Sequence, residues 1–433
     1  MWIHRWILSS FILAATLSEC KFSNPLDASS LSSPAAHGVV SAKLQFIKNN
    51  RSIGRQRIKN LKRRLKNKMC RLQPRDKLSG SLFSETLQNT RQQNLRNMDS
   101  ASCMLGSIEN KLTYYMLNIS VGTPEKQFMV QVDTGSSDLW IPGRSLHHRG
   151  YDPSQSRSFT NLSEAFHIQY AKDSATGYWG TELVRLGNSQ YNAITLQMAI
   201  VTSAPDPSMG ILGIGPIESE TSSNLYLNLP HMLAKQKLIS KPIYSMYMDK
   251  IDSVGGQILF GGIDKAKYKR LTTLPFACDS TISVKTDAIF MNKVQFNQKP
   301  IDVLLDTGTS FTYLPEYIVN AIAREFSASY DSDIGLYVIH EHEFKKFREG
   351  ISFRFNDIIV NMPIAELFWP LSWFSLEPSS YLAMSILTSK DSLYVNILGD
   401  SFLRNAYVIY DLEKSEVHIG QYFPSTKSNI VPI

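Results

Sequence analysis

The chain has 433 residues, 43% of them hydrophobic, which is enough to bury a substantial core and excludes a disordered protein. Its formal net charge is +7, but residues 21–100 hold 17 basic and 4 acidic side chains, whereas residues 101–433 hold 27 basic and 33 acidic ones. The basic character therefore belongs to one upstream segment, and the net charge alone does not indicate a nucleic-acid-binding protein.

The first twenty residues have the layout of a signal peptide. Arg5 precedes an apolar run over residues 6–17, and a small-x-small triplet closes the segment at 18–20. The run is shorter than the roughly 20 residues that a permanent membrane span needs, and no later segment is long and apolar enough. We therefore expect residues 1–20 to be removed and the mature protein to be soluble in a secretory compartment, either secreted or held in an acidic vacuole or secretory organelle.

Residues 21–100 form a basic segment that we interpret as a detachable inhibitory piece and linker. From Ala42 to about Arg75, apolar residues recur at spacings of three or four, which predicts an amphipathic helix. The polar stretch 79–99 predicts an exposed linker, which is a natural site of cleavage. A solvated arm and a nucleic-acid-binding arm are alternative interpretations; the second predicts that this segment persists in the mature chain.

Cysteine usage excludes a dense disulfide scaffold. Cys20 leaves with the signal, so Cys70, Cys103 and Cys278 remain and allow at most one intramolecular pair. Cys103 with Cys278 is conceivable, because Cys70 lies in the segment that we expect to be removed. No Cys-x-x-Cys pair occurs, and the His-Glu-His-Glu run at 340–343 lacks His-Glu-x-x-His spacing, so we interpret that run as a solvated turn and expect no metal or other cofactor.

After about residue 101 the chain is mainly β, because short β-branched and aromatic runs alternate with Gly, Pro, Asn and Asp. Strands are expected over 117–121, 128–132, 243–248, 257–260 and 408–410, and helices over 230–239 and 316–326.

One internal duplication dominates this region. The sequence Asp-Thr-Gly-Ser-Ser-Asp-Leu-Trp-Ile-Pro at 133–142 recurs as Asp-Thr-Gly-Thr-Ser-Phe-Thr-Tyr-Leu-Pro at 306–315, and each copy follows an apolar strand. Each copy is also followed by Ile-Leu-Gly, at 211–213 and 397–399. The repeat distance lies outside the periods of solenoid proteins, so we expect two similar lobes, over residues 101–273 and 274–433.

The duplicated motif predicts a pair of catalytic carboxylates, Asp133 and Asp306. One Asp-Thr-Gly turn is merely a capped loop, but two turns from two lobes can bring their carboxyl groups face to face. Two carboxyl groups at such a short distance cannot both be ionised, because their negative charges repel each other. The pair therefore shares one proton. One carboxylate can then take a proton from water while the other donates to a carbonyl oxygen, which needs no cofactor and favours acidic pH.

These residues resemble the pepsin family of aspartic proteases, including cathepsin D and the plasmepsins of apicomplexan parasites. The resemblance covers roughly residue 40 to the C-terminus and includes Val-Gly-Thr-Pro at 121–124, Gly-Gln-Ile-Leu-Phe-Gly-Gly at 256–262 and Ile-Leu-Gly-Asp at 397–400. It implies a mainly β, bilobal pepsin-like fold with the active-site cleft between the lobes.

The resemblance also assigns roles by motif. Thr134 and Thr307 would make crossed hydrogen bonds between the active-site loops, and Ser136 and Thr309 would bond the outer carboxylate oxygens. Residues expected to contact substrate are Gly135, Trp140, Tyr170, Ser174 and Gly308. Tyr170 takes the position of the flap tyrosine with Trp140 as its partner, and Ala171 and Asp173 replace flap glycines.

We therefore expect an aspartic endopeptidase, made as a zymogen, that cleaves peptides or proteins next to apolar residues. Its own propeptide would be an intramolecular inhibitor released by acid. The enzyme should be monomeric, because one chain carries both half-sites, and it should not bind nucleic acid. The alternative is a catalytically silent binding protein on the same fold, although such proteins usually lose an Asp or its Thr-Gly, and both copies are intact here.

Overall fold

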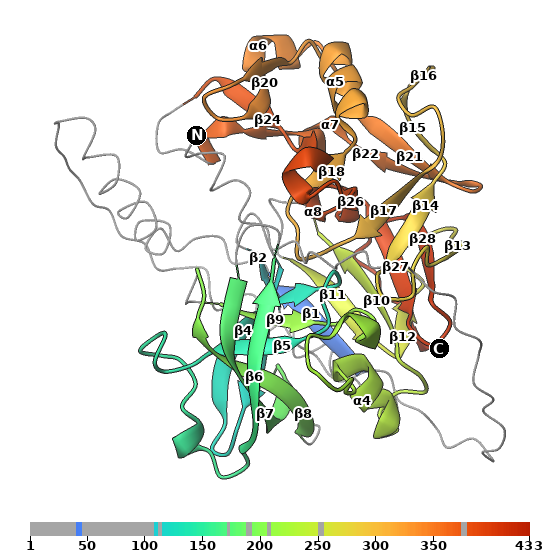
Figure 1. Ribbon diagram of the computed structural model, residues 1–433. Helices are drawn as coiled ribbons and strands as arrows, with labels where there is room; N and C mark the ends of the chain where they lie inside the picture. Colours follow the sequence, from blue (N-terminus) through green and yellow to red (C-terminus); the bar gives the residue numbers. More distant parts are fainter. Residues whose placement is uncertain are drawn as a thin grey trace, which may run out of the picture. The chain divides into compact units, whose positions relative to one another are not determined.

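The computed structural model describes residues 40–45, 108–110, 115–170, 174–187, 193–205, 209–249, 255–373 and 379–433. The expected signal peptide, most of the basic segment, the linker, Cys70 and Cys103 lie outside these residues. Figure 1 shows strands throughout both halves of the described chain and only short helices, which confirms a mainly β, bilobal fold. None of the described helices has the length and apolar composition that crossing a bilayer requires.

The N-terminal half is built on one eight-stranded sheet. In spatial order its strands are β2 (Ile108–Asn110), β3 (Tyr115–Val121), β4 (Lys126–Asp133), β9 (Gly210–Gly213), β5 (Leu139–Pro142), β8 (Ile194–Ser203), β7 (Ser174–Leu186) and β6 (Thr160–Gln169). The helix α4 (Leu229–Lys235) follows the sheet, as expected, but it ends before the predicted residue 239. Lys237 has a φ of 59°, a left-handed conformation that an α-helix cannot continue through.

The C-terminal half contains three smaller sheets. The first orders β14 (Ser283–Thr286), β17 (Ile301–Leu305), β26 (Ile397–Leu398), β18 (Thr312–Leu314) and β25 (Ile386–Thr388). The second orders β16 (Val294–Gln295), β15 (Ala288–Met291), β21 (Ile351–Phe355) and β22 (Ile358–Met362). The third orders β19 (Ser329–Asp331), β20 (Leu336–His340), β24 (Tyr381–Met384) and β23 (Phe368–Pro370).

Short helices complete this half. They are α5 (Glu316–Glu325), α6 (Glu341–Phe344), α7 (Ile364–Leu367), α8 (Asp400–Leu403) and the 3-10 turns η3 (Leu371–Trp373) and η4 (Ser389–Ser392). In α5 the side chains of Ile318 and Ile322 are buried, and Phe326, which follows the helix, is buried too. This is the apolar face that the sequence predicts.

The two copies of the duplicated motif have the same strand pairing. β4, which leads into the first copy, runs parallel to β9, and β17 runs parallel to β26 in the second half. β5 and β18, which follow the two copies, pair antiparallel with the same partners β9 and β26. Each Ile-Leu-Gly element is therefore the strand that lies between the two arms of an active-site loop.

A six-stranded sheet joins the halves. Its order is β1 (Val40–Gln45), β11 (Gly255–Phe260), β10 (Ile243–Met248), β27 (Ala406–Asp411), β28 (Glu416–Gln421) and β13 (Thr272–Pro275). The central pairing joins β10 to β27, with Ile243 opposite Asp411. At the C-terminal end of the chain, β29 (Ile430–Pro432) pairs with β12 (Gly262–Asp264).

The structure corrects the prediction of helix from Ala42. Residues 40–45 form β1, which pairs antiparallel with β11 from Val40 opposite Phe260 to Gln45 opposite Gly255. Helical spacing of apolar residues is a local signal, and here the hydrogen-bonding edge of β11 decides the conformation instead. The rest of the predicted helix lies outside the described residues.

Candidate active site

Asp133 and Asp306 lie at equivalent positions in the two halves. Asp133 is the last residue of β4, and Asp306 follows β17 directly. Both side chains are almost fully buried, as are the threonines after them. Since the strands leading to both residues are fixed by parallel partners, the backbone of each loop is positioned by the core of its own half.

Thr134 and Thr307 link the two loops by symmetric hydrogen bonds. The backbone N–H of each threonine donates to the hydroxyl oxygen of the other, at 3.1 Å in both directions. Each hydroxyl in turn donates to a carbonyl oxygen of the opposite half, Thr134 to Leu305 and Thr307 to Val132, both at 2.8 Å. These four bonds in a buried interface hold the loops rigidly together.

Each carboxylate receives one backbone and one hydroxyl hydrogen bond from its own loop. Gly135 N donates to Asp133 Oδ1 at 2.8 Å, and Ser136 Oγ donates to Asp133 Oδ2 at 2.5 Å. Gly308 N donates to Asp306 Oδ1 at 2.7 Å, and the Thr309 hydroxyl donates to Asp306 Oδ2. The outer oxygen of each carboxylate is therefore bonded to the hydroxyl residue that the sequence suggests.

The two glycines of the motif lie against the carboxylate of the opposite half. A Cβ atom at Gly135 would come to 2.6 Å from Asp306 Oδ1, and one at Gly308 would clash with Asp133 Oδ1. Either contact is too close for a real side chain, so glycine is required for the carboxylates to approach each other. The resemblance to pepsins suggested a different role for these two glycines, which is contact with substrate.

Burial raises the pKa of both carboxyl groups, and the charge of Asp133 adds to the shift of Asp306. Loss of hydration is the main cause of the raised pKa of Asp133, partly offset by its hydrogen bonds from Ser136 and with Asp306. The pKa of Asp306 is raised well above its ordinary value by burial and then by the negative charge of Asp133. Two groups in this relationship share a proton over a range of pH.

Tyr170 and Trp140 form the hydrogen-bonded pair that the sequence suggests. Trp140 Nε1 donates to Tyr170 Oη at 2.8 Å, and both side chains are buried in one cluster with Phe166 and Trp179. Tyr170 comes directly after β6, and Ser174 begins β7 opposite Gln169, so β6 and β7 form a hairpin. Ala171 and Asp173, at its tip, lie outside the described residues.

Sequence reasoning missed two residues beside this site. Gln131 Nε2 donates to the carbonyl oxygen of Gly308 at 3.0 Å, which adds a further contact between the halves. The sequence did contain a signal for Gln131, because it is a polar residue between apolar residues of a strand.

Asp400 is fully buried, and neither of its carboxylate oxygens has a hydrogen-bond partner within the described part of the chain. Burial raises its pKa well above the usual range, although Arg404 opposes the shift.

A second group of buried carboxyls lies behind the first loop. Asp138 accepts hydrogen bonds from the backbone N–H and hydroxyl of Thr221 at 3.1 and 2.7 Å, and from Tyr226 Oη at 2.8 Å. Burial raises the pKa of Asp138 to about 6, partly offset by these bonds. Burial raises the pKa of Glu220, which accepts a bond from Tyr226 N, to about 8, and the charge of Asp138 contributes to this shift.

The run at 340–343 is a short helix with surface ion pairs. His340 caps the N-terminus of α6, because its Nδ1 accepts a hydrogen bond from His342 N at 3.2 Å. Glu341 pairs with Lys345 and Glu343 with Lys346. The predicted solvated turn is thus one helical turn whose acidic side chains are satisfied by lysines.

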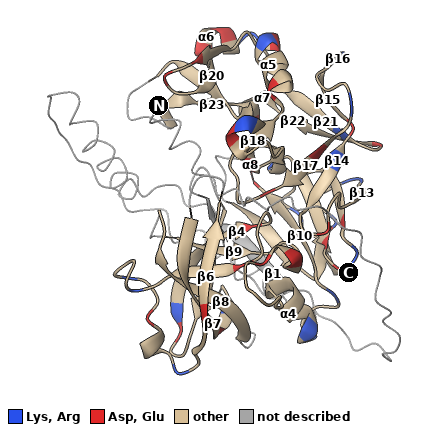
Figure 2. Ribbon diagram, in the orientation of Figure 1, with Lys and Arg blue, Asp and Glu red and all other residues tan. Residues whose placement is uncertain are grey.

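Figure 2 shows acidic and basic residues interspersed over both halves of the described chain.

Two similar β-rich halves that meet at a pair of buried aspartates are typical of the class of aspartic proteases. Comparison with known sequences agrees, since the model of the family described as "Eukaryotic aspartyl protease" matches residues 114–422. The chain belongs to this family, and it is an aspartic endopeptidase by class.

The chain is similar to curated proteases of Saccharomycopsis fibuligera and Candida albicans. The chain is 35% identical over 347 residues to an "Acid protease" of Saccharomycopsis fibuligera, covering 76% of this chain and 85% of the relative. It is 31% identical over 343 residues to "Candidapepsin-3" of Candida albicans, covering 75% and 83% of the two chains. It is 33% identical over 346 residues to "Secreted aspartic protease 1" of the same species, covering 76% and 86%.

Proposed function

We propose that Asp133 and Asp306 are the catalytic residues and that they hydrolyse peptide bonds by activating a water molecule. The observation that carries this proposal is the close approach of the two carboxyl groups, each packed over the glycine of the opposite loop. The raised pKa of Asp306 beside ionisable Asp133 supports a shared proton at acidic pH.

In the proposed reaction, the ionised carboxylate of the pair takes a proton from water as the water attacks the scissile carbonyl carbon. The protonated partner donates to the carbonyl oxygen, so the charge of the tetrahedral intermediate is neutralised. Thr134, Ser136, Thr307 and Thr309 hold the carboxylates in position. No step requires a metal or another cofactor.

We further propose that an extended peptide lies between the loops and the β6–β7 hairpin. Gly135 and Gly308 would leave room for its backbone, and Tyr170, Trp140 and Ser174 would contact it from the hairpin side. Closing a hairpin over the peptide excludes water and orders the bond to be cleaved. A preference for apolar residues beside that bond belongs to the same proposal and rests on the resemblance to pepsins.

Synthesis as a zymogen is a separate proposal. Residues 1–20 would be the signal and residues 21–100 the inhibitory propeptide and linker, followed by lobes over 101–273 and 274–433. The pairing of β1 with β11 supports this organisation, because it anchors residues 40–45 of the basic segment to the sheet that joins the halves. At neutral pH, the cations of the segment would be held by carboxylates, and protonation of those carboxylates in acid would release them.

The location and lineage are also proposals. The printed names of relatives include "Secreted aspartic protease", which supports passage through the secretory pathway, and an acidic vacuole or secretory organelle is the finer possibility. The resemblance to pepsins implies three family disulfides, for which four cysteines are too few, and this supports a likeness to some parasite paralogues rather than to a gastric enzyme. A monomer is proposed because one chain supplies both carboxylates.

The test is to acidify the purified full-length chain and to follow cleavage of a peptide library by mass spectrometry. We expect Asp306→Asn to abolish cleavage while the thermal unfolding midpoint changes little. Asp302→Asn is the matched control, because Asp302 lies on the same strand but is exposed and pairs only loosely with Lys285 at 3.8 Å. Persistent cleavage by the Asp306 variant would overturn the mechanism.

A further inference from the structure

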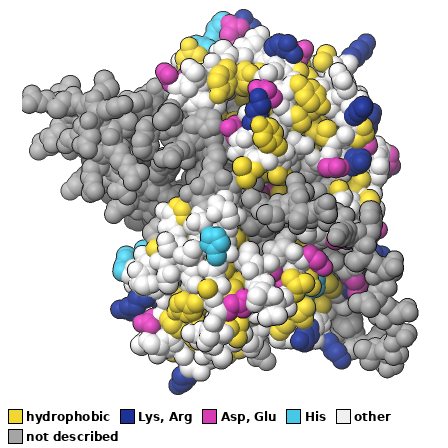
Figure 3. All heavy atoms as spheres, in the orientation of Figure 1, with side chains coloured by type: hydrophobic (Ala, Val, Ile, Leu, Met, Phe, Trp, Pro, Cys, Tyr) yellow, Lys and Arg dark blue, Asp and Glu magenta, His cyan; other side chains and the backbone are white. Residues whose placement is uncertain are grey.

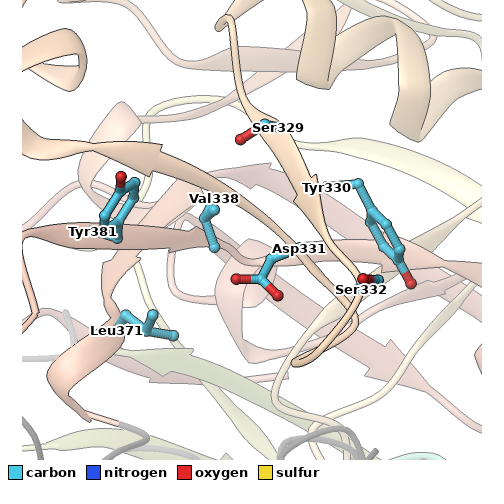
Figure 4. A pocket seen from close by; sticks show the side chains of 7 residues that line it. All are labelled: Ser329, Tyr330, Asp331, Ser332, Val338, Leu371 and Tyr381. Carbon is cyan, nitrogen blue, oxygen red and sulfur yellow. The ribbon is translucent and has the colours of Figure 1, made fainter.

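A separate cavity of about 390 Å³ lies in the C-terminal half. It is lined by Ser329, Tyr330, Asp331 and Ser332 on β19 and the turn after it, by Val338 on β20, by Leu371 on η3 and by Tyr381 on β24. Figure 4 shows the carboxylate of Asp331 in the middle, with Tyr381 and Leu371 on one side and Tyr330 and Ser332 on the other. The lining thus combines one acidic group, two aromatic rings and two aliphatic side chains.

The Asp331 carboxylate has an oxygen available for a ligand. Its Oδ1 accepts from the backbone N–H groups of Asp333 and Ile334 at 2.9 and 3.3 Å, which fixes the side chain in the turn. Within the described part of the chain, no hydrogen bond to Oδ2 and no ion pair of Asp331 is found. Other carboxylates on this half are paired, such as Glu316 with Lys390 at 2.6 Å and Asp357 with Arg270 at 2.5 Å.

The cavity is connected through the core to the second active-site loop. Val338 belongs to a hydrophobic cluster that contains Phe311, two residues beyond Thr309, and Leu371 packs against this cluster. In the same cluster, the rings of Phe311 and Trp369 lie 5.1 Å apart. The sheet that carries the cavity therefore packs directly against the loop of Asp306, so its position relative to the catalytic pair is fixed.

The aromatic side chains of the cavity are accessible. Tyr330 is 57% exposed and Tyr381 is 45% exposed, although large hydrophobic side chains are usually buried. Figure 3 shows hydrophobic side chains on the surface of both halves, interspersed with charged ones. Tyr330 packs on Tyr337 and Tyr381 packs on His340, so both rings are held in place while part of each stays exposed.

We infer that this cavity is an outer specificity site that binds a lysine or arginine side chain of the peptide substrate, with Asp331 as the residue that recognises the cation. The inference rests on the proposed function, since the peptide is the one that Asp133 and Asp306 would cleave. An extended peptide advances about 3.3 Å per residue, so a residue several positions from the cleaved bond reaches well beyond the catalytic pair.

The chemistry of the cavity matches a basic side chain. Lysine and arginine have an aliphatic stem that packs on apolar walls such as Leu371 and Val338, and a charged end group that needs an acidic partner. An ammonium or guanidinium group can donate to Asp331 Oδ2 while it contacts the ring of Tyr381. An anion is disfavoured because the lining contains a carboxylate and neither lysine nor arginine.

The test uses peptides that share one apolar cleavage site and differ at a single outer position. Each position is filled in turn with lysine or with norleucine, which keeps the stem and removes the charge. In the unaltered protein we expect kcat/KM to be about fivefold to tenfold higher with lysine than with norleucine at one position. A charge pair and a ring contact at a partly exposed site have about this effect.

Asp331→Asn should bring the ratio of kcat/KM for the lysine peptide to that for the norleucine peptide to about one. The value for the norleucine peptide itself should stay unchanged. Asparagine keeps an Oδ1 acceptor for the turn, so the fold is preserved, and a thermal melt checks this. Asp302→Asn, which removes an equal charge elsewhere on the same half, should keep the preference. Equal cleavage of both peptides by the unaltered protein at every position, or a preference that survives in Asp331→Asn, would refute the inference.

A binding measurement separates this inference from the proposed function. Fluorescence anisotropy of the same labelled peptides is measured with Asp306→Asn and with the double variant that adds Asp331→Asn. Tighter binding of the lysine peptide, lost in the double variant, supports the cavity even if the unaltered protein cleaves no peptide. No difference between the peptides in binding overturns the cavity even if cleavage is observed.

Discussion

Thr134 and Thr307 exchange backbone-to-hydroxyl hydrogen bonds of equal length across the interface of the two halves. Each hydroxyl serves both as an acceptor from the opposite threonine and as a donor to a carbonyl of the opposite strand. The relative placement of Asp133 and Asp306 therefore depends on two side chains that do not take part in the reaction.

Thr307→Val should destabilise the protein and lower its activity. Valine has the shape of threonine but leaves Thr134 N and Val132 O buried without partners, which costs about 2–4 kcal/mol in the free energy of unfolding. Urea unfolding measures the loss, and kcat/KM on a peptide should fall with it. Thr307→Ser keeps the hydroxyl, so its free energy of unfolding and its kcat/KM should both be close to those of the unaltered protein. Full activity in the valine variant would show that the crossed bonds do not position the carboxylates.

Stability should fall as pH rises from about 4 to 8. The pKa of Asp138 is raised by burial to about 6 and that of Glu220 to about 8, so the folded state favours their protonated forms. Their contribution is fully present below the unfolded pKa values near 4 and is lost as pH rises through the folded values.

Asp138→Asn tests this pH dependence, because asparagine cannot ionise. Unfolding free energies at a series of pH values should show a flatter profile, with a difference from the unaltered protein of about 3 kcal/mol between pH 4 and 8. Glu125→Gln is the control, since Glu125 is an exposed carboxylate that pairs with Arg185. An unchanged slope in the Asp138 variant would contradict the prediction.

Tyr170→Phe should reduce turnover without unfolding the chain. It removes the hydroxyl that accepts from Trp140 Nε1 and keeps the ring in its cluster. One neutral hydrogen bond contributes about 1 kcal/mol, so kcat/KM should fall about fivefold. A double-mutant cycle with Trp140→Phe should give a coupling of similar size. Additive effects of the two changes would show that the bond does not position the hairpin.

Gly308→Ala should be more damaging to catalysis than its small size suggests. The added Cβ would meet Asp133 Oδ1, so the carboxylates must separate. We expect kcat to fall at least about a hundredfold, because a displacement of about 1 Å at a reacting group can have that effect. Circular dichroism and a thermal melt check the fold. A folded variant with normal kcat would show that the pair tolerates separation.

The fold class and the close approach of Asp133 and Asp306 were predictable because their signals are local and occur twice. Each Asp-Thr-Gly follows an apolar strand, and the repeat implies two lobes that can face each other. The requirement for glycine at 135 and 308 was only partly predictable, since the atoms that exclude a side chain belong to the opposite half. Asp331 escaped prediction because its cavity is assembled from separate segments of the C-terminal half.

The same limit explains the error at residues 40–45. Their apolar spacing fits a helix, but the free edge of β11 is more than 200 residues away in the sequence and is invisible to a local pattern. Helices 230–239 and 316–326 were predicted correctly in type because their apolar faces and the prolines at their N-terminal ends are local. The largest difference in bounds is at the end of the first, where Lys237 adopts a left-handed conformation.

The pairing of β10 with β27 has a consequence for biosynthesis. Lys241 and Asp411, at one end of this pairing, are separated by 170 residues and bonded at 2.9 Å. During translation, β10 leaves the ribosome long before β27 has been synthesised. The backbone groups along that edge of β10 therefore stay without hydrogen-bond partners in the meantime. Chains that terminate before β27 would keep that edge open to aggregation, so only a chain synthesised through residue 411 can cover it.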